Sequence, residues 1–153
     1  MANPDQFANR IRRIAVGVVD GAVNNVRNTA LVAIRTVTRF TPKDTTLARS
    51  NWVANIGSPD LSERPIRPAS EVVAEARTSL DRGRIRASIL SRNSVEIHIA
   101  NGGDKVPYLA TLDRGSSKQA PAGFVKMALQ ESGAKTLVKA RLLRGRKSEA
   151  VGV

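Results

Sequence analysis

The amino-acid sequence predicts an α+β fold in which a long amino-terminal helix and a carboxy-terminal helix pack on a small β-sheet. Apolar residues recur at steps of three and four over residues 7–39 and again after Gly123, which is the spacing of one helix face. Two short segments, 51–56 and 95–99, alternate between two faces in the way that is typical of half-buried strands.

Length and composition indicate one domain, which we expect to span residues 1–143, followed by a flexible basic tail at 144–153. Of the 153 residues, 41% are hydrophobic and only 3% are aromatic, so Val, Ile, Leu and Ala must fill the core. The absence of cysteine excludes disulfides and thiolate chemistry. No window approaches the roughly 18 apolar residues of a membrane span, so we expect no membrane partner.

The first predicted element is a helix over residues 7–39, which Asn3 or Asp5 can cap and Pro42 stops. Its apolar row is Phe7, Ile11, Ile14, Val18, Ala22, Val26, Ala30, Ala33 and Val37. A second row is Ala15, Val19, Val23, Leu31 and Ile34. So wide a stripe on so long a helix predicts contacts on two sides, with its own sheet and with a neighbouring subunit. Gly17 and Gly21 either permit close approach of another helix or are tolerated weak points.

The first strand, 51–56, places Trp52, Ala54 and Ile56 on one face, and we expect Trp52 to anchor the core. Residues 57–68 contain three prolines and predict an extended loop that suits a subunit contact. The second strand, built on Val95, Ile97 and Ile99, should end at residues 101–103.

Between the strands, Ser70 is the expected cap of another helix. One interpretation continues this helix through Gly83, and its apolar row is then Val73, Ala76, Leu80, Ala87 and Leu90. The other ends the helix near Asp81 and makes Ile85, Ala87 and Ile89 one face of a strand, and the pattern alone does not decide between them. In the final helix, the residues near helical spacing are Phe124, Met127, Ala128, Glu131, Ala134, Leu137, Val138 and Leu142.

Residues 101–124 carry a motif of turn-forming residues between the second strand and the last helix. An apolar strand ends in Asn, a Pro-Tyr pair opens a short helix, an acidic residue and Gly close it, and Ser-Lys-Gln-Ala-Pro leads onward. The residues at these steps are Asn101, Pro107, Tyr108, Asp113, Gly115, Gln119, Pro121 and Gly123. This order resembles the signature of the tail completion (head-tail joining, or neck) proteins of long-tailed double-stranded DNA phages.

A second segment that resembles the same family lies upstream, at Pro42, Asp44, Thr45 and Trp52. The family usually has Gly after Asp-Thr, whereas this chain has Thr46. The resemblance also favours the longer of the two interpretations of the helix that follows residue 69.

The resemblance implies a structural virion protein, not an enzyme, with no cofactor. It implies a homo-oligomeric ring, a hexamer, at the head-proximal end of the viral tail, which joins the tail to the capsid neck. The implied partners are other copies of the chain, the tail terminator or tail tube, and head-closure or connector proteins, with genomic DNA passing transiently through the lumen. The implied location is the tail or neck of the virion, after assembly in the host cytoplasm.

The formal net charge of +12 predicts a polyanionic neighbour, or self-repulsion that an assembly must tolerate. Residues 1–50 carry eight basic and three acidic residues, and residues 126–153 carry seven and two. The candidate DNA or partner contacts are Arg12, Arg13, Arg27, Arg35, Arg39, Lys135, Lys139, Arg141, Arg144, Arg146 and Lys147. The alternative function is therefore a basic, sequence-independent DNA-binding protein. A solvated basic face, or ion pairs with a partner protein, would explain the same residues.

Catalytic chemistry has little support in the sequence. His98, the single histidine, could form a triad on paper with Asp113 and Ser116, but no nucleophile-elbow pattern surrounds the serine, and a surface histidine is the better interpretation. One histidine and no cysteine make a zinc site improbable. Residues 115–118 lack the spacing of a phosphate-binding loop, so we expect Gly115 to end the short helix and Pro121 to start the next one.

Overall fold

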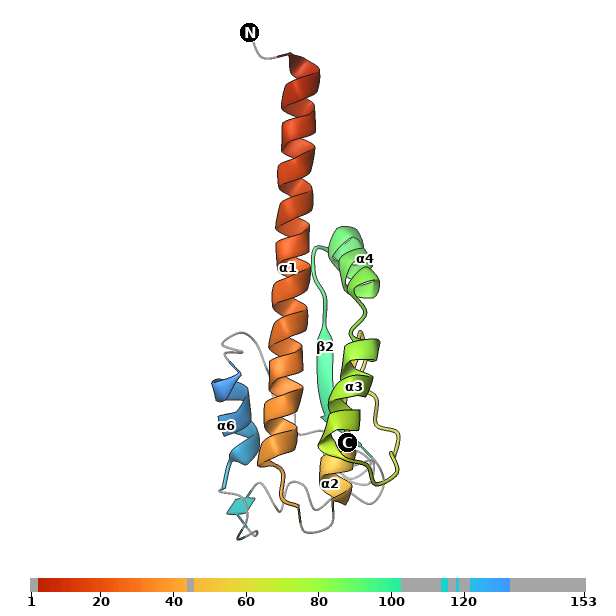
Figure 1. Ribbon diagram of the computed structural model, residues 1–153, viewed down its shortest axis with the longest axis vertical. Coiled ribbons are helices and arrows are strands. Elements are labelled where there is room, and N and C mark those ends of the chain that lie inside the picture. Colours follow the sequence, from red (N-terminus) through yellow and green to blue (C-terminus); the bar gives the residue numbers. More distant parts are fainter. Residues whose placement is uncertain (1–2, 44–45, 103–113, 116–117, 119–121, 133–153) are drawn as a thin grey trace, which may run out of the picture.

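The computed structural model describes residues 3–43, 46–102, 114–115, 118 and 122–132, and it has the predicted α+β class (Figure 1). The elements are α1 (Pro4–Phe40), α2 (Leu47–Ser50), β1 (Trp52–Ile56), α3 (Ala69–Ser79), α4 (Arg82–Arg92), β2 (Ile97–Asn101) and α6 (Phe124–Glu131). Strands β1 and β2 pair antiparallel, with Trp52 opposite Asn101 and Ile56 opposite Ile97.

Helix α1 agrees with the predicted range of 7–39 to within one turn. Its 37 residues make a rod of roughly 55 Å at 1.5 Å per residue. Asn3 is the cap, because its side chain accepts a hydrogen bond of 3.1 Å from the Asp5 N–H. The helix ends at Phe40, and Thr41 is already extended, as expected of a residue before Pro42.

Threonines near the end of α1 tolerate burial because each hydroxyl donates to the carbonyl four residues earlier. The Oγ1 atoms of Thr36, Thr38 and Thr41 lie 2.6–2.7 Å from the carbonyl oxygens of their partners. Thr41 Oγ1 also accepts a hydrogen bond of 2.8 Å from Trp52 Nε1. The predicted role of Trp52 as a core anchor is confirmed, since it is buried and its polar atom is satisfied.

The core lies around the carboxy-terminal half of α1. Helix α6 packs on one side of α1, and α3 and β2 lie on the other (Figure 1). The buried cluster consists of Val23, Ala30, Ile34, Val37, Ala48, Trp52, Ala54, Ile56, Val72, Ala76, Leu80, Ile85, Phe124 and Ala128. As the composition predicts, most of its members are small or aliphatic.

Strand β1 is buried on both faces, so the prediction of a half-buried strand is wrong. Trp52, Ala54 and Ile56 face the cluster as predicted, yet Val53 on the other face is also only 3% exposed. The 57–68 segment, which has no helix or strand as predicted, folds back over this end of the sheet. There the backbone of Leu61 approaches Gly102 so closely that a Cβ at Gly102 would lie 2.4 Å from it.

Residues 69–92 form two helices, so neither interpretation of this segment is fully right. The first helix ends before Asp81, as the shorter interpretation predicts, but residues 85–89 are helical and not a strand. Asp81 causes the break, since its carboxylate accepts a hydrogen bond of 3.0 Å from the Arg84 N–H and caps α4. Leu80 and Ile85 are buried on either side of the break, whereas Leu90 is exposed.

Ser70 does not cap α3, contrary to the prediction. The helix begins one residue earlier, because the Pro68 carbonyl oxygen already accepts from the N–H groups of Glu71 and Val72. Helix α6 begins where expected, with Gly123 as its cap at φ +74°. Phe124 and Ala128 are buried, whereas Met127 is exposed, and the rest of the predicted final helix lies outside the described residues.

Candidate functional site

The amino-terminal part of α1 projects beyond every other described element (Figure 1). Along it, the predicted apolar row remains uncovered: Phe7, Ile11, Ile14 and Val18 are 62%, 50%, 55% and 66% exposed. We call these four residues the projecting apolar row. The Asp20–Arg86 ion pair marks where α4 begins to lie against α1. Such a continuous exposed row is typical of a surface that another protein covers.

Gly17 and Gly21 lie near the end of this projecting part. A Cβ built at either glycine would have no atom within 4 Å, so neither position serves close packing inside the described chain. Arg10 and Arg13 line a shallow hollow of about 420 Å³ beside Phe7. Basic side chains therefore flank the apolar row on the same part of the helix.

A second basic region lies at the opposite end of α1, and we call it the basic groove. It is an open hollow of about 490 Å³ between the last turns of α1, Lys43, Arg49 and α3. Its basic lining residues are Arg35, Arg39, Lys43, Arg49 and Arg77. The remaining lining residues are Thr38, Ala69, Ser70 and Val73, so no acidic residue lines it among those described. Sequence analysis singled out Arg35 and Arg39, but gave no reason to join them with Arg49 and Arg77.

Two of the predicted basic contacts have partners within the fold, and one of them, Arg39, also lines the groove. Arg27 donates hydrogen bonds of 2.8 Å and 3.2 Å to the carbonyl oxygens of Leu80 and Arg77, at the end of α3. Arg39 forms an ion pair of 2.5 Å with Glu131 on α6, and both side chains are largely exposed. Arg12 and Arg13 lie on the projecting part of α1. Lys135, Lys139, Arg141, Arg144, Arg146 and Lys147 lie outside the described residues.

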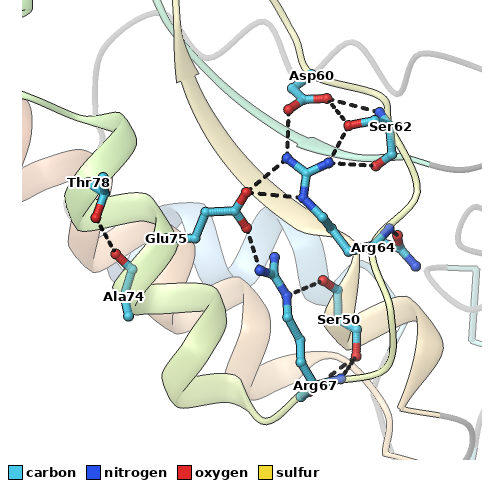
Figure 2. A network of polar contacts seen from close by, with 9 residues as sticks. Ser50, Asp60, Ser62, Arg64, Arg67, Ala74, Glu75 and Thr78 are labelled. Carbon is cyan, nitrogen blue, oxygen red and sulfur yellow. Dashed lines mark hydrogen bonds and ion pairs between the residues drawn. The ribbon is translucent and has the colours of Figure 1, made fainter.

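The 57–68 segment is held by a network of ion pairs that sequence analysis missed (Figure 2). Glu75 on α3 lies 2.8 Å from Arg64 Nη2 and 2.5 Å from Arg67 Nη1. Arg64 also pairs with Asp60 at 2.7 Å, and Arg67 Nε donates to the Ser50 carbonyl oxygen at 3.1 Å. A charge pattern four residues apart could have suggested the Asp60–Arg64 pair, but Glu75 joins it only through the folding of the chain.

The ion pairs and hydrogen bonds of this network favour the charged forms of Asp60, Glu75 and Arg64. Hydrogen bonds from the Ser62 hydroxyl and N–H, and then from Arg64, lower the pKa of Asp60 to about 2. Burial by itself would raise the pKa of Glu75, but hydrogen bonds from Arg64 and Arg67 outweigh burial and lower it. The hydrogen bonds that Arg64 donates to Glu75 in turn raise the pKa of Arg64. The network therefore acts as a fixed structural brace.

The described residues of the family motif have structural roles. Pro42 and Trp52 are buried, and Asn101 Nδ2 donates a hydrogen bond of 2.5 Å to the Ala48 carbonyl oxygen. Gly115 and Gly123 have positive φ, as expected of glycines that direct a turn. Asp44, Thr45, Pro107, Tyr108, Asp113, Gln119 and Pro121 lie outside the described residues.

Thr46 occupies the position where the resembling family usually has Gly, and its backbone is in the left-handed region at φ +53°. The local turn thus keeps the conformation that glycine favours, with a β-branched residue in it. Asn51, five residues later, is fully buried. The alternation of strand 51–56 places it on the face opposite Trp52, where an exposed polar side chain is expected. Its side chain accepts from the Arg64 N–H at 2.7 Å and donates to the Leu47 carbonyl oxygen at 2.8 Å.

His98 lies on β2 with Glu96 as its partner, at 3.4 Å between Nε2 and Oε2. Asp113 and Ser116, the other members of the triad considered above, lie outside the described residues. Within the described part of the chain, no three His, Cys, Asp or Glu residues group together in a way that could hold a metal ion. Nor does any helix there have the length and apolar character needed to span a membrane.

Comparisons with known proteins found no match among family models, curated proteins or solved structures.

Proposed function

We propose that this protein is a structural assembly protein of a phage particle, which forms a homo-oligomeric ring at the head-proximal end of the tail. In this role it joins the tail tube or tail terminator to the head-closure or connector proteins of the capsid neck. Genomic DNA passes through the lumen of the ring. The protein is assembled in the host cytoplasm and remains in the tail or neck of the virion.

The projecting apolar row is the observation that carries this proposal. Phe7, Ile11, Ile14 and Val18 are each at least half exposed in the single chain, on a helix that no other described element covers there. A large apolar side chain contributes about 1.5–3 kcal/mol when fully buried, so covering four of them favours association substantially. A protein that acts as a single chain would leave this row in water.

A closed ring is one arrangement in which identical copies cover this row without leaving an open end. The row lies on a projecting rod, and the other described elements form the packed body from which the rod emerges (Figure 1). A projecting part that packs on the next subunit makes a heterologous contact, which closes into a ring when the rotation between subunits permits it. The proposal that the ring is a hexamer, and that it lies at the head-proximal end of the tail, depends on the family resemblance of residues 101–124.

The proposal is tested by measuring the mass of the purified chain by size-exclusion chromatography with light scattering, alone and after mixing with tail tubes. We expect species that are multiples of 16.4 kDa. The double substitution Ile11→Gln/Ile14→Gln should return the protein to single chains, because it makes the centre of the row polar. Leu90→Gln is the control, since Leu90 is 65% exposed, somewhat more than Ile11 and Ile14, but lies on α4.

A chain that stays single at every concentration, and that is also absent from virus particles, would contradict the proposal. If that single chain binds duplex DNA with strong salt dependence, the alternative function, a sequence-independent DNA-binding protein, replaces it. Loss of assembly in Leu90→Gln to the same degree would show that the row on α1 is not the contact.

A further inference from the structure

The basic groove is a concave part of the surface in which several positively charged side chains lie together. Five basic side chains line it: two come from α1, one from α3, and the other two are Lys43 and Arg49. The first turn of α3 also lines the groove through Ala69 and Ser70, and the partial positive charge of a helix amino terminus adds to the same field. A hollow with charges of one sign focuses the electrostatic potential and attracts ligands of the opposite sign.

The fold neutralises only part of this charge within the described residues. Arg39 has one exposed partner, Glu131, and Arg49 Nη2 donates a hydrogen bond of 2.8 Å to the Thr41 carbonyl oxygen. Arg49 Nε is buried and has no hydrogen-bond partner among the described residues. The exposed side chains of Arg35 and Arg77 form no hydrogen bond or ion pair with the rest of the described chain. The groove therefore offers donors that are available to an anion.

The spacing of the basic residues suits an extended peptide. Arg35 and Arg39 lie four residues apart on α1, which places them about 6 Å apart along the helix axis. Alternate side chains of an extended strand lie on one face, at intervals of roughly 6.6 Å. Carboxylates at every second position of a bound segment would therefore meet successive basic side chains.

A second copy of this chain cannot supply such a segment. No two of its 13 acidic residues are adjacent or separated by a single residue, so none of its segments carries carboxylates at alternate positions. Single-stranded nucleic acid is also disfavoured, because no aromatic side chain lines the groove for base stacking. A rigid duplex carries its phosphates on a convex surface, which does not enter a hollow of about 490 Å³.

We infer that the basic groove binds an extended acidic segment of a different protein, with carboxylates at alternate positions. This inference concerns a surface separate from the projecting apolar row, and it holds whether or not the protein forms a ring. If the protein acts at the junction of head and tail, the acidic segment belongs to one of the proteins joined there.

The test is fluorescence anisotropy of a short labelled peptide with Glu at alternate positions, measured against the full-length chain at low salt. The same peptide with Gln in place of Glu, a short DNA duplex and a thymidine oligonucleotide are the comparison probes. The groove variant is Arg35→Glu/Arg77→Glu, because these two side chains hold no described contact and their replacement leaves the fold intact. Arg12→Glu/Arg13→Glu makes the same change of charge on the projecting part of α1, and circular dichroism verifies that both variants are folded.

We expect the Glu peptide to bind more tightly than the Gln peptide and both DNA probes, and the groove variant to weaken its binding by about tenfold. The control variant should weaken it by less than about twofold, since only the general field of the protein changes. Equal weakening by both variants, or no binding of the Glu peptide, would overturn the inference. Tighter binding of either DNA probe that depends on Arg35 and Arg77 would also overturn it and would assign the groove to nucleic acid.

Discussion

The two halves of α1 have the same apolar spacing but opposite surroundings. In the carboxy-terminal half, Ile34 and Val37 are almost completely buried against α3, α6 and the sheet. In the amino-terminal half, Ile14 and Val18 are 55% and 66% exposed. Periodicity therefore shows which face of a helix is apolar, but it does not show whether the same chain covers that face. A row that the described part of the chain leaves open is typical of a surface for another molecule.

The sharpest test of this comparison removes equal side chains from the two halves. Ile34→Ala should lower the free energy of unfolding by about 3 kcal/mol, because it leaves a cavity in the core. Ile14→Ala should lower it by less than about 0.5 kcal/mol when the chain is single, because the side chain is already in water. Urea denaturation at low protein concentration measures both values. Similar losses at the two positions would mean that the projecting half also packs within one chain.

A second experiment examines the packed body, in which the carboxylates of Asp60 and Glu75 brace residues 57–68. Above pH 5 the double variant Asp60→Asn/Glu75→Gln should be about 2 kcal/mol less stable than the original protein, because Arg64 and Arg67 lose their partners. The pKa of Asp60 is lowered to about 2 and that of Glu75 is also lowered, so the folded protein binds protons less readily than the unfolded chain. The contribution of the network is thus complete above the ordinary carboxylate pKa and is lost as the pH falls toward 2.

The measurement is urea denaturation of both proteins at several pH values between 7 and 2.5. The difference in stability between them should shrink steadily in acid. Glu71→Gln is the control, because Glu71 is exposed on the same helix and takes no part in the network. A difference that does not change with pH would show that the carboxylates act through packing and not through charge.

The smallest expected effect comes from a matched pair of arginines in the two halves of α1. Arg27→Met should lower the stability by about 1–2 kcal/mol, because the carbonyl oxygens of Leu80 and Arg77 lose their donor. Arg12→Met should change the stability by less than about 0.5 kcal/mol, since its single described partner is the exposed Asn9 at 3.4 Å. Thermal denaturation followed by circular dichroism distinguishes these values. Equal changes in melting temperature for the two variants would show that the hydrogen bonds from Arg27 to the end of α3 do not stabilise the fold.

Sequence reasoning was most accurate where a local pattern decides the structure. The cap at Asn3, the stop before Pro42 and the pairing segments around Trp52 and Ile97 depend on residues close together in the chain. It was least accurate around Leu80 and Asp81, where the pattern left one long helix and a helix followed by a strand both open, and the structure has two helices. Asp81 lies between the two helices and caps the second one. A sequence does not distinguish an acidic residue that caps a helix from an exposed acidic residue in the middle of one.

The sequence by itself determined the α+β class, the extent of α1, the positions of the strands and the excess of positive charge, because periodicity, proline and composition act locally. Only the tertiary structure decided which basic residues serve the fold and which line the groove. Arg27 meets the end of α3, and Glu75 meets Arg64 and Arg67, across separations that no local pattern encodes. The folded body covers one half of the apolar face of α1 and leaves the other half exposed, because the described helices and strands that pack on α1 reach only its carboxy-terminal part.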